Sequence, residues 1–162
     1  MVNYKRLNQD STVSMVAGVQ FQPGVSKQVV LLSPDAMRAQ DRAYRRIVTR
    51  DYAASLEPLA LADSLAPDPN YVVFHADNAG YRAFALLQLH RYDEAEAEAL
   101  RSLALSPTER NGLKVMGSVL AIQGRLDEAL ENVNHLLELD PGDVSEQRLR
   151  ASILAQRAAD AR

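Results

Sequence analysis

From residue 33 to the C-terminus, apolar and polar positions alternate with the period of a helix. Apolar residues recur every three to four positions, which is the spacing of one face of an amphipathic helix. Ser33-Pro34-Asp35 opens this region with a capping hydroxyl, a proline suited to the first helical position and a carboxylate that complements the helix dipole. Similar punctuation recurs at Asp68-Pro69, Ser106-Pro107 and Asp140-Pro141. These marks divide the chain into segments of roughly 34 to 40 residues, a period that indicates stacked helix pairs.

Two stretches of this region are nearly the same. Residues 91–107 read RYDEAEAEALRSLALSP and residues 125–141 read RLDEALENVNHLLELDP, so they begin 34 residues apart. We interpret them as the second helices of neighbouring repeats. The shared Ala and Leu then serve packing, the shared Arg, Asp and Glu belong to the helix start, and the shared Pro closes the unit.

Residues 1–32 follow a different pattern. VSMVAGVQF and KQVVLL are rich in Val and flank the turn-forming pair Pro23-Gly24. This arrangement predicts a β-hairpin or two extended segments. A lone hairpin is marginally stable in water, so it needs the helical body or another chain to dock on. We therefore divide the chain into an N-terminal extended segment, residues 1–32, and a helical domain, residues 33–162.

From about residue 34 onward the chain resembles the tetratricopeptide repeat (TPR) family, whose repeat of about 34 residues forms two antiparallel helices. The family places small residues where its helices approach each other and a proline at the end of the repeat. In the last repeat, counted from Arg110, the matching residues are Leu113, Gly117, Leu120, Gly124, Ala129 and Pro141. The resemblance implies an all-α, right-handed α-solenoid of about three helix pairs. Residues 143–157 are expected to form a C-terminal capping helix.

Three features depart from the family pattern. Arg50 and His90 stand where the family has a glycine at the end of the first helix. Pro58 falls inside a second helix, where it removes a backbone hydrogen bond. The prolines that close the first two repeats lie 40 residues apart instead of 34. We therefore predict a lengthened first helix in the second repeat, over about residues 69–89, the alternative being a break at residues 77–80.

Composition and charge argue against several classes of partner and several kinds of site. The net charge of −3 is too small to indicate a nucleic acid or an anionic membrane surface as partner. The chain has no cysteine, which removes disulfides, thiolate metal sites and cysteine nucleophiles. No stretch is long and apolar enough for a transmembrane helix. We expect no nucleic-acid partner and no membrane insertion. The abundance of Arg and Ala points to a bacterial source. A cytoplasmic location is favoured, with a periplasmic one left open if a signal peptide was removed.

Motifs for catalysis or cofactor binding are not apparent. His75, His90 and His135 are scattered without the spacing of a metal site. The glycines form no phosphate-binding loop, and the carboxylates of DEAEAE (93–98) are interpreted as a solvated helix start. We expect no catalytic residues, no metal and no cofactor, and therefore a protein that is not an enzyme.

The resemblance also implies where a partner binds. In the family, the first helices of successive repeats line a concave groove that accepts an extended peptide or a helix. The residues that map onto this groove are Gln40, Tyr44, Ile47, Asp77, Phe84, Leu87, Asn111, Lys114, Ser118 and Arg148. Tyr44 and Phe84 are candidate anchors for apolar side chains, the alternative being that they pack against each other or on the N-terminal segment. Lys114 and Arg148 are candidates for holding a carboxylate.

Some TPR domains bind chaperone C-terminal carboxylates through a clamp of Lys and Asn. Gln40 and Tyr44 replace the first-repeat Lys and Asn of that clamp, which argues against binding of a chaperone tail. The leading hypothesis is a non-catalytic adaptor or scaffold that binds a peptide or protein segment of unknown identity in the groove. One alternative is a structural subunit that forms homo- or hetero-oligomers through residues 1–32. The other is a holder of a client protein, similar to secretion chaperones.

Overall fold

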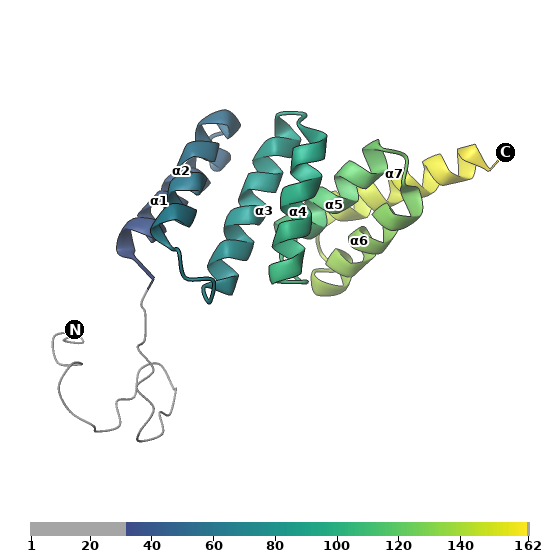
Figure 1. The fold of residues 1–162 in the computed structure, drawn as a ribbon. Coiled ribbons are helices and arrows are strands. Elements are labelled where there is room, and N and C mark those ends of the chain that lie inside the picture. Colours follow the sequence, from purple (N-terminus) through teal and green to yellow (C-terminus); the bar gives the residue numbers. More distant parts are fainter. Residues whose placement is uncertain (1–31, 162) are drawn as a thin grey trace, which may run out of the picture. The chain divides into compact units, whose positions relative to one another are not determined.

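A computed structural model describes residues 32–161 of the chain. This part consists of helices in series, without a strand (Figure 1). The helices are α1 (Pro34–Val48), α2 (Tyr52–Leu65), α3 (Val72–Gln88), α4 (Tyr92–Leu105), α5 (Arg110–Ile122), α6 (Leu126–Leu139) and α7 (Val144–Asp160). The N-terminal hairpin or extended segment predicted for residues 1–32, and the oligomer interface predicted there, lie outside the described residues apart from Leu32.

The helices form three pairs followed by a single helix. α1 packs on α2, α3 on α4 and α5 on α6, while α7 packs mainly on α6. Neighbouring pairs stack in chain order (Figure 1). α3 contacts both α1 and α5, whereas no contact joins α2 to α4 or α4 to α6 in this part of the chain. The arrangement confirms the predicted all-α solenoid of three helix pairs with a capping helix.

The helix starts follow the punctuation in the sequence. The Ser33 hydroxyl accepts a hydrogen bond from the Asp35 backbone N–H at 3.2 Å, and Pro34 takes the first helical position of α1. Asp143 caps α7 in the same way, since its carboxylate accepts from the backbone N–H groups of Ser145 and Glu146. These side chains satisfy donors that have no partner inside the helix.

α3 is longer than the other first helices, as predicted, but it begins at Val72 rather than at residue 69. A turn precedes it, because the Asp68 carboxylate accepts from the Asn70 backbone N–H at 2.9 Å. The helix is continuous through residues 77–80, so the alternative of a break there is wrong. α2 likewise continues through Pro58 as one helix.

Within each pair, the helices approach each other at a residue with little or no side chain. Ala43, Ala83 and Gly117 occupy equivalent positions of α1, α3 and α5, and all three are buried. A β-carbon on Gly117 would lie 2.7 Å from a methyl carbon of Val133 in α6. Larger apolar side chains fill the space around these points and form the core.

The buried apolar residues form two clusters. The larger one extends from α3 to α7 and includes Leu86, Leu120, Val133 and Ile153. The smaller one joins α1 and α2 to the start of α3, and its members are Ala36, Ala39, Ala62, Ala66 and Phe74. The two clusters share no buried residue, and α3 contributes to both of them, Phe74 to the smaller and Leu86 to the larger.

The three turns between the helices of each pair have one backbone shape but different residues. Arg50, His90 and Gly124 have φ values of 61°, 59° and 77°. In each turn the next residue donates its N–H to a carbonyl five residues back, as Arg125 does to Leu120 at 2.9 Å. The glycine that the family prefers at this position is therefore replaced twice by a residue that adopts the left-handed conformation at a cost.

We expect Gly124→Ala to destabilise the domain by about 1–2 kcal/mol, because a β-carbon is disfavoured at this positive φ. No atom lies within 4 Å of the added carbon, so the loss comes from the backbone and not from a clash. Gly142→Ala is the matched control, since Gly142 is not among the residues with positive φ. Urea unfolding measures both variants, and equal stability of the two would contradict the backbone interpretation.

Candidate partner-binding face

The residues that the sequence maps onto a groove all lie on first helices or on the capping helix. α1 carries Gln40, Tyr44 and Ile47, α3 carries Asp77, Phe84 and Leu87, α5 carries Asn111, Lys114 and Ser118, and α7 carries Arg148. We call the surface defined by these residues and Tyr81 the inner face. The reason is that successive first helices contact one another, whereas successive second helices do not within the described residues. Which of these residues bind a partner stays a prediction.

Two tyrosines and an aspartate form the centre of the inner face. The ring centroids of Tyr44 and Tyr81 lie 5.7 Å apart and bridge α1 and α3. Tyr44 is 48% exposed, so the ring pair is open to solvent. Asp77 is half-buried one helical turn before Tyr81, and it has no hydrogen bond or ion pair within the described residues. Burial and, to a smaller extent, the Glu109 carboxylate raise the pKa of Asp77. Aromatic faces beside an unpaired carboxylate suit a cationic side chain.

Phe84, the other aromatic candidate, takes part in the packing of the helices. Its ring lies edge-on to that of Tyr52 in α2, with the centroids 6.1 Å apart. Phe84 and Leu87 are partly buried against the larger core cluster. Ile47 is partly buried as well. The ring partner of Tyr44 is therefore Tyr81 and not Phe84, and the open part of the inner face is centred on that tyrosine pair.

The Glu109 side chain lies between α3 and α5, where Gly80 and Gly112 leave room for it. Its carboxylate caps α5 by accepting from the backbone N–H groups of Asn111 and Gly112. The Asn111 side-chain amide donates to the same carboxylate at 3.0 Å, and the Ser102 hydroxyl lies 3.0 Å from it. A β-carbon on Gly80 would lie 2.7 Å from the Glu109 carboxyl carbon, so only glycine fits there. Asn111 is thus held by Glu109, and a buried negative charge lies beneath the centre of the inner face.

The C-terminal end of the inner face is less basic than its sequence indicates. Lys114 Nζ lies 2.7 Å from Asp143 Oδ2, and this contact holds the pKa of Asp143 well below its usual range. Glu146 is buried, and its Oε2 has no hydrogen-bond partner among the described residues. Burial raises the pKa of Glu146. Arg148 is exposed and has no ion pair in the described part of the chain. Arg148 is therefore a cation that this end leaves available to a partner.

A polar network joins repeats 1 and 2 beneath the inner face. Gln40 donates to Asn78 Oδ1 at 2.9 Å, and the fully buried Asn78 donates to Asp63 Oδ1 at 3.0 Å. Arg82 bridges Asp63 at 2.7 Å and Glu98 at 3.1 Å. Burial by itself would raise the pKa of Asp63, but the hydrogen bonds from Arg82 and Asn78 outweigh it and lower the pKa. Gln40 thus uses its amide group in an internal contact.

Two of the three histidines, His75 and His90, take part in side-chain contacts. His75 Nδ1 lies 3.4 Å from Asp63 Oδ1, and His90 Nδ1 lies 2.8 Å from the Tyr92 hydroxyl. Across residues 32–161, no three His, Asp or Glu side chains are grouped in a way that could hold a metal ion. None of the described helices combines the length and the apolar character needed to cross a membrane.

Solved structures with the same arrangement of helices exist. The first TPR domain of Spaghetti (RPAP3), bound to the HSP90 peptide SRMEEVD, matches with a TM-score of 0.69 and 17% identity, covering 79% of this chain and 99% of that one. The chain has the fold of a tetratricopeptide repeat domain. The second TPR domain of human RPAP3, in complex with the HSP70 peptide SGPTIEEVD, matches with a TM-score of 0.61 and 21% identity over 74% of this chain and 94% of that one.

A third similar structure is that of the myosin chaperone UNC-45 from C. elegans in complex with an Hsp90 peptide. It matches with a TM-score of 0.70 and 16% identity, covering 78% of this chain and 14% of that one. No family model matches the chain, and no curated protein matches it. At these identities the likeness concerns the fold, so the chemistry of the inner face has to be argued from this chain's own residues.

Three residues that shape the inner face of this TPR fold were not among the candidates from the sequence. Tyr81 lies four residues after Asp77 and therefore on the same side of α3, so its spacing carried a usable signal. Asn78 and Glu109 act across the junctions between repeats. Their roles depend on the offset of one repeat against the next, which the pattern within a single repeat does not contain.

We expect Asp63→Asn to destabilise the domain at pH 7 by about 2 kcal/mol, because Arg82 loses one of its two charged acceptors in a half-buried network. Folding lowers the pKa of Asp63, so its contribution is present above the unfolded value of 3.8 and is lost as the pH falls through the folded-state pKa. The difference from wild type should therefore shrink below pH 3.8 in urea unfolding. Asp41→Asn, in an exposed pair with Arg45, is the control with little effect. A difference that does not depend on pH would contradict this account.

Proposed function

We propose that the TPR domain is a non-catalytic adaptor that binds a segment of a partner protein on its inner face. A lysine or arginine of that segment is held between Tyr44, Tyr81 and Asp77. The observation that carries the proposal is the open tyrosine pair beside a half-buried carboxylate that has no partner within the described residues. A cation that enters this site contacts two aromatic faces and at the same time becomes the counter-ion of the carboxylate.

Known complexes of the same fold support a role in peptide binding. The TPR domains of Spaghetti (RPAP3) and human RPAP3 are described with bound HSP90 and HSP70 peptides, and the myosin chaperone UNC-45 is described in complex with an Hsp90 peptide. A TPR fold is therefore able to hold a short peptide without further domains. Because the identities are low, the chemical class of the peptide is inferred from this chain's own side chains.

The charges of the inner face favour a basic segment over an acidic chaperone tail. Gln40, which stands where the clamp lysine would be, donates to Asn78 and carries no charge. Lys114 is paired with Asp143. At the centre, Asp77 and the buried Glu109 carboxylate together disfavour a second anion and attract a cation. Arg148 at the far end determines the orientation of the bound segment, because acidic residues of the segment would lie toward α7.

Affinity capture from a lysate of the source organism tests the binding surface. We expect the Tyr44→Ala, Asp77→Asn double variant to reduce capture of the partner by about tenfold or more, because it removes one ring and the carboxylate. Burial raises the pKa of Asp77, so the charged form is disfavoured in the folded state and Asp77→Asn does not lower stability at pH 7. Glu131→Gln, an exposed position on the second helix α6, is the control that keeps full capture.

The peptide SRMEEVD separates a basic from an acidic preference. We expect it to bind the wild-type chain more weakly than about 1 mM, because the centre of the inner face repels its carboxylates. Isothermal calorimetry measures the affinity. Micromolar binding that becomes tighter in Asp77→Asn would refute the cationic preference while leaving the adaptor role in place. Unchanged capture by the double variant would refute the binding face itself.

A further inference from the structure

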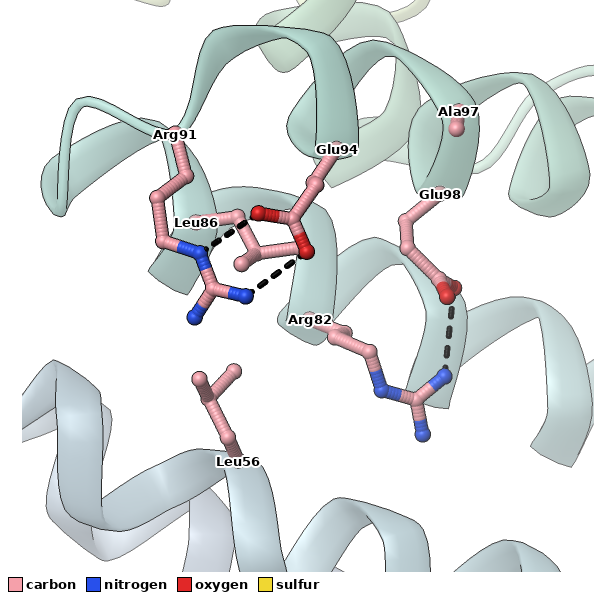
Figure 2. A pocket seen from close by; sticks show the side chains of 7 residues that line it. All are labelled: Leu56, Arg82, Leu86, Arg91, Glu94, Ala97 and Glu98. Carbon is pink, nitrogen blue, oxygen red and sulfur yellow. Dashed lines mark hydrogen bonds and ion pairs between the residues drawn. The ribbon is translucent and has the colours of Figure 1, made fainter.

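A pocket of about 250 Å³ opens at the junction of repeats 1 and 2, among α2, α3 and α4. Figure 2 shows Leu56 of α2 facing the Arg91 guanidinium across the pocket. Leu86 and Ala97 also line it, and the Arg82–Glu98 pair closes one side. The pocket thus combines apolar walls with two arginines, Arg82 and Arg91, each paired with a glutamate of the lining, and none of its residues belongs to the inner face.

Arg91 uses only part of its hydrogen-bonding capacity. Its Nε and Nη2 donate to the two carboxylate oxygens of Glu94, each at 2.7 Å. Among the described residues, no acceptor is present for the remaining nitrogen, Nη1. Figure 2 shows that nitrogen turned away from Glu94, on the side of Leu56. The guanidinium therefore presents a donor to the pocket.

The next repeat shows what such a donor binds. Arg125 occupies the position equivalent to Arg91, and its Nε and Nη2 donate to Glu128 in the same way. Its Nη1, however, donates to Glu96 Oε1 at 2.8 Å, across the junction of repeats 2 and 3. The two arginine side chains are similarly exposed, 45% for Arg91 and 42% for Arg125. The difference lies in the residue opposite them, because Leu56 holds the position that Glu96 holds one repeat later.

We propose that this pocket binds a carboxylate side chain of a partner protein, which takes on Arg91 the place that Glu96 takes on Arg125. The aliphatic stem of a glutamate packs on Leu56, Leu86 and Ala97 while its head accepts from Nη1. For Glu96, hydrogen bonds from Gln123 and Arg125 lower its pKa. Leu89 stands in place of Gln123 beside the Arg91 pocket, so there the arginine is the group that would hold the carboxylate. The site is separate from the inner face and does not depend on the function proposed above.

The test uses the full chain and two small probes, acetyl-glutamate amide and acetyl-glutamine amide. They differ only in the carboxylate. Side-chain ¹⁵N NMR follows the Arg91 Nε signal during titration, with Arg125 as internal reference because its Nη1 already donates to Glu96. We expect the glutamate probe to shift Arg91 at least about fivefold more than the glutamine probe, and to leave Arg125 nearly unmoved.

Two variants of Leu56 separate binding in the pocket from general surface binding. Leu56→Glu supplies the missing carboxylate from within the chain, so the response of Arg91 to the glutamate probe should disappear. Leu56→Gln removes the same leucine without adding a charge, and it should keep the response. Arg91→Gln, at an exposed position, should abolish the probe's effect on the signals of Leu56 and Leu86 without affecting the fold. Equal shifts with both probes, or an unchanged titration in Leu56→Glu, would overturn the proposal.

Discussion

The close approach of helices, within a pair and between pairs, is the constraint on which the rest of the structure depends. Gly117 leaves room for Val133, and Gly80 leaves room for the Glu109 carboxylate, so at both points one methyl group is too large. Close approach brings α3 against α1 and α5, and this contact decides which side chains face the solvent together. Tyr44 and Tyr81 meet because α1 and α3 meet. The inner face therefore depends on the packing of the first helices, which determines where its side chains lie.

The junctions between repeats fill equivalent places with different chemistry. Between repeats 1 and 2 an amide pair, Gln40 and Asn78, bridges the first helices. Between repeats 2 and 3 the Glu109 carboxylate lies against Gly80 and Gly112. Between repeat 3 and the capping helix, Lys114 lies near the buried Glu146. A segment lying along the inner face would meet a neutral, then an acidic and then a mixed surface. The tight geometry is repeated, whereas the charges are not, and this difference is what would give the proposed binding face its selectivity.

The fold followed from the sequence because spacing within one repeat determines which residues pack. The positions of Ala, Gly and Pro predicted the helix pairs, and the start of α1 at Ser33-Pro34-Asp35 was confirmed. The start of α3 was misjudged because the Asp68 side chain forms a turn that holds residues 68–71 outside the helix. The partners of Tyr44, Gln40 and Glu109 were not predicted, because they depend on how one repeat is shifted against the next. Periodicity determines which side of a helix a residue is on, but not which residue it meets there.

The division of the core into two clusters bears on how repeat 1 is held to the rest of the domain. Apolar packing is continuous from α3 to α7, and repeat 1 is joined to it both by apolar contacts, through Phe74 and the Tyr52–Phe84 rings, and by the polar network of Asp63 and Arg82. Solenoids yield at their weakest neighbour contact, and ionised contacts weaken as salt is added while apolar ones do not. At the junction of repeats 1 and 2, added salt therefore weakens the ionised part of the contact and leaves the apolar part in place. Repeat 1 is thus held by two kinds of contact that respond differently to the solvent.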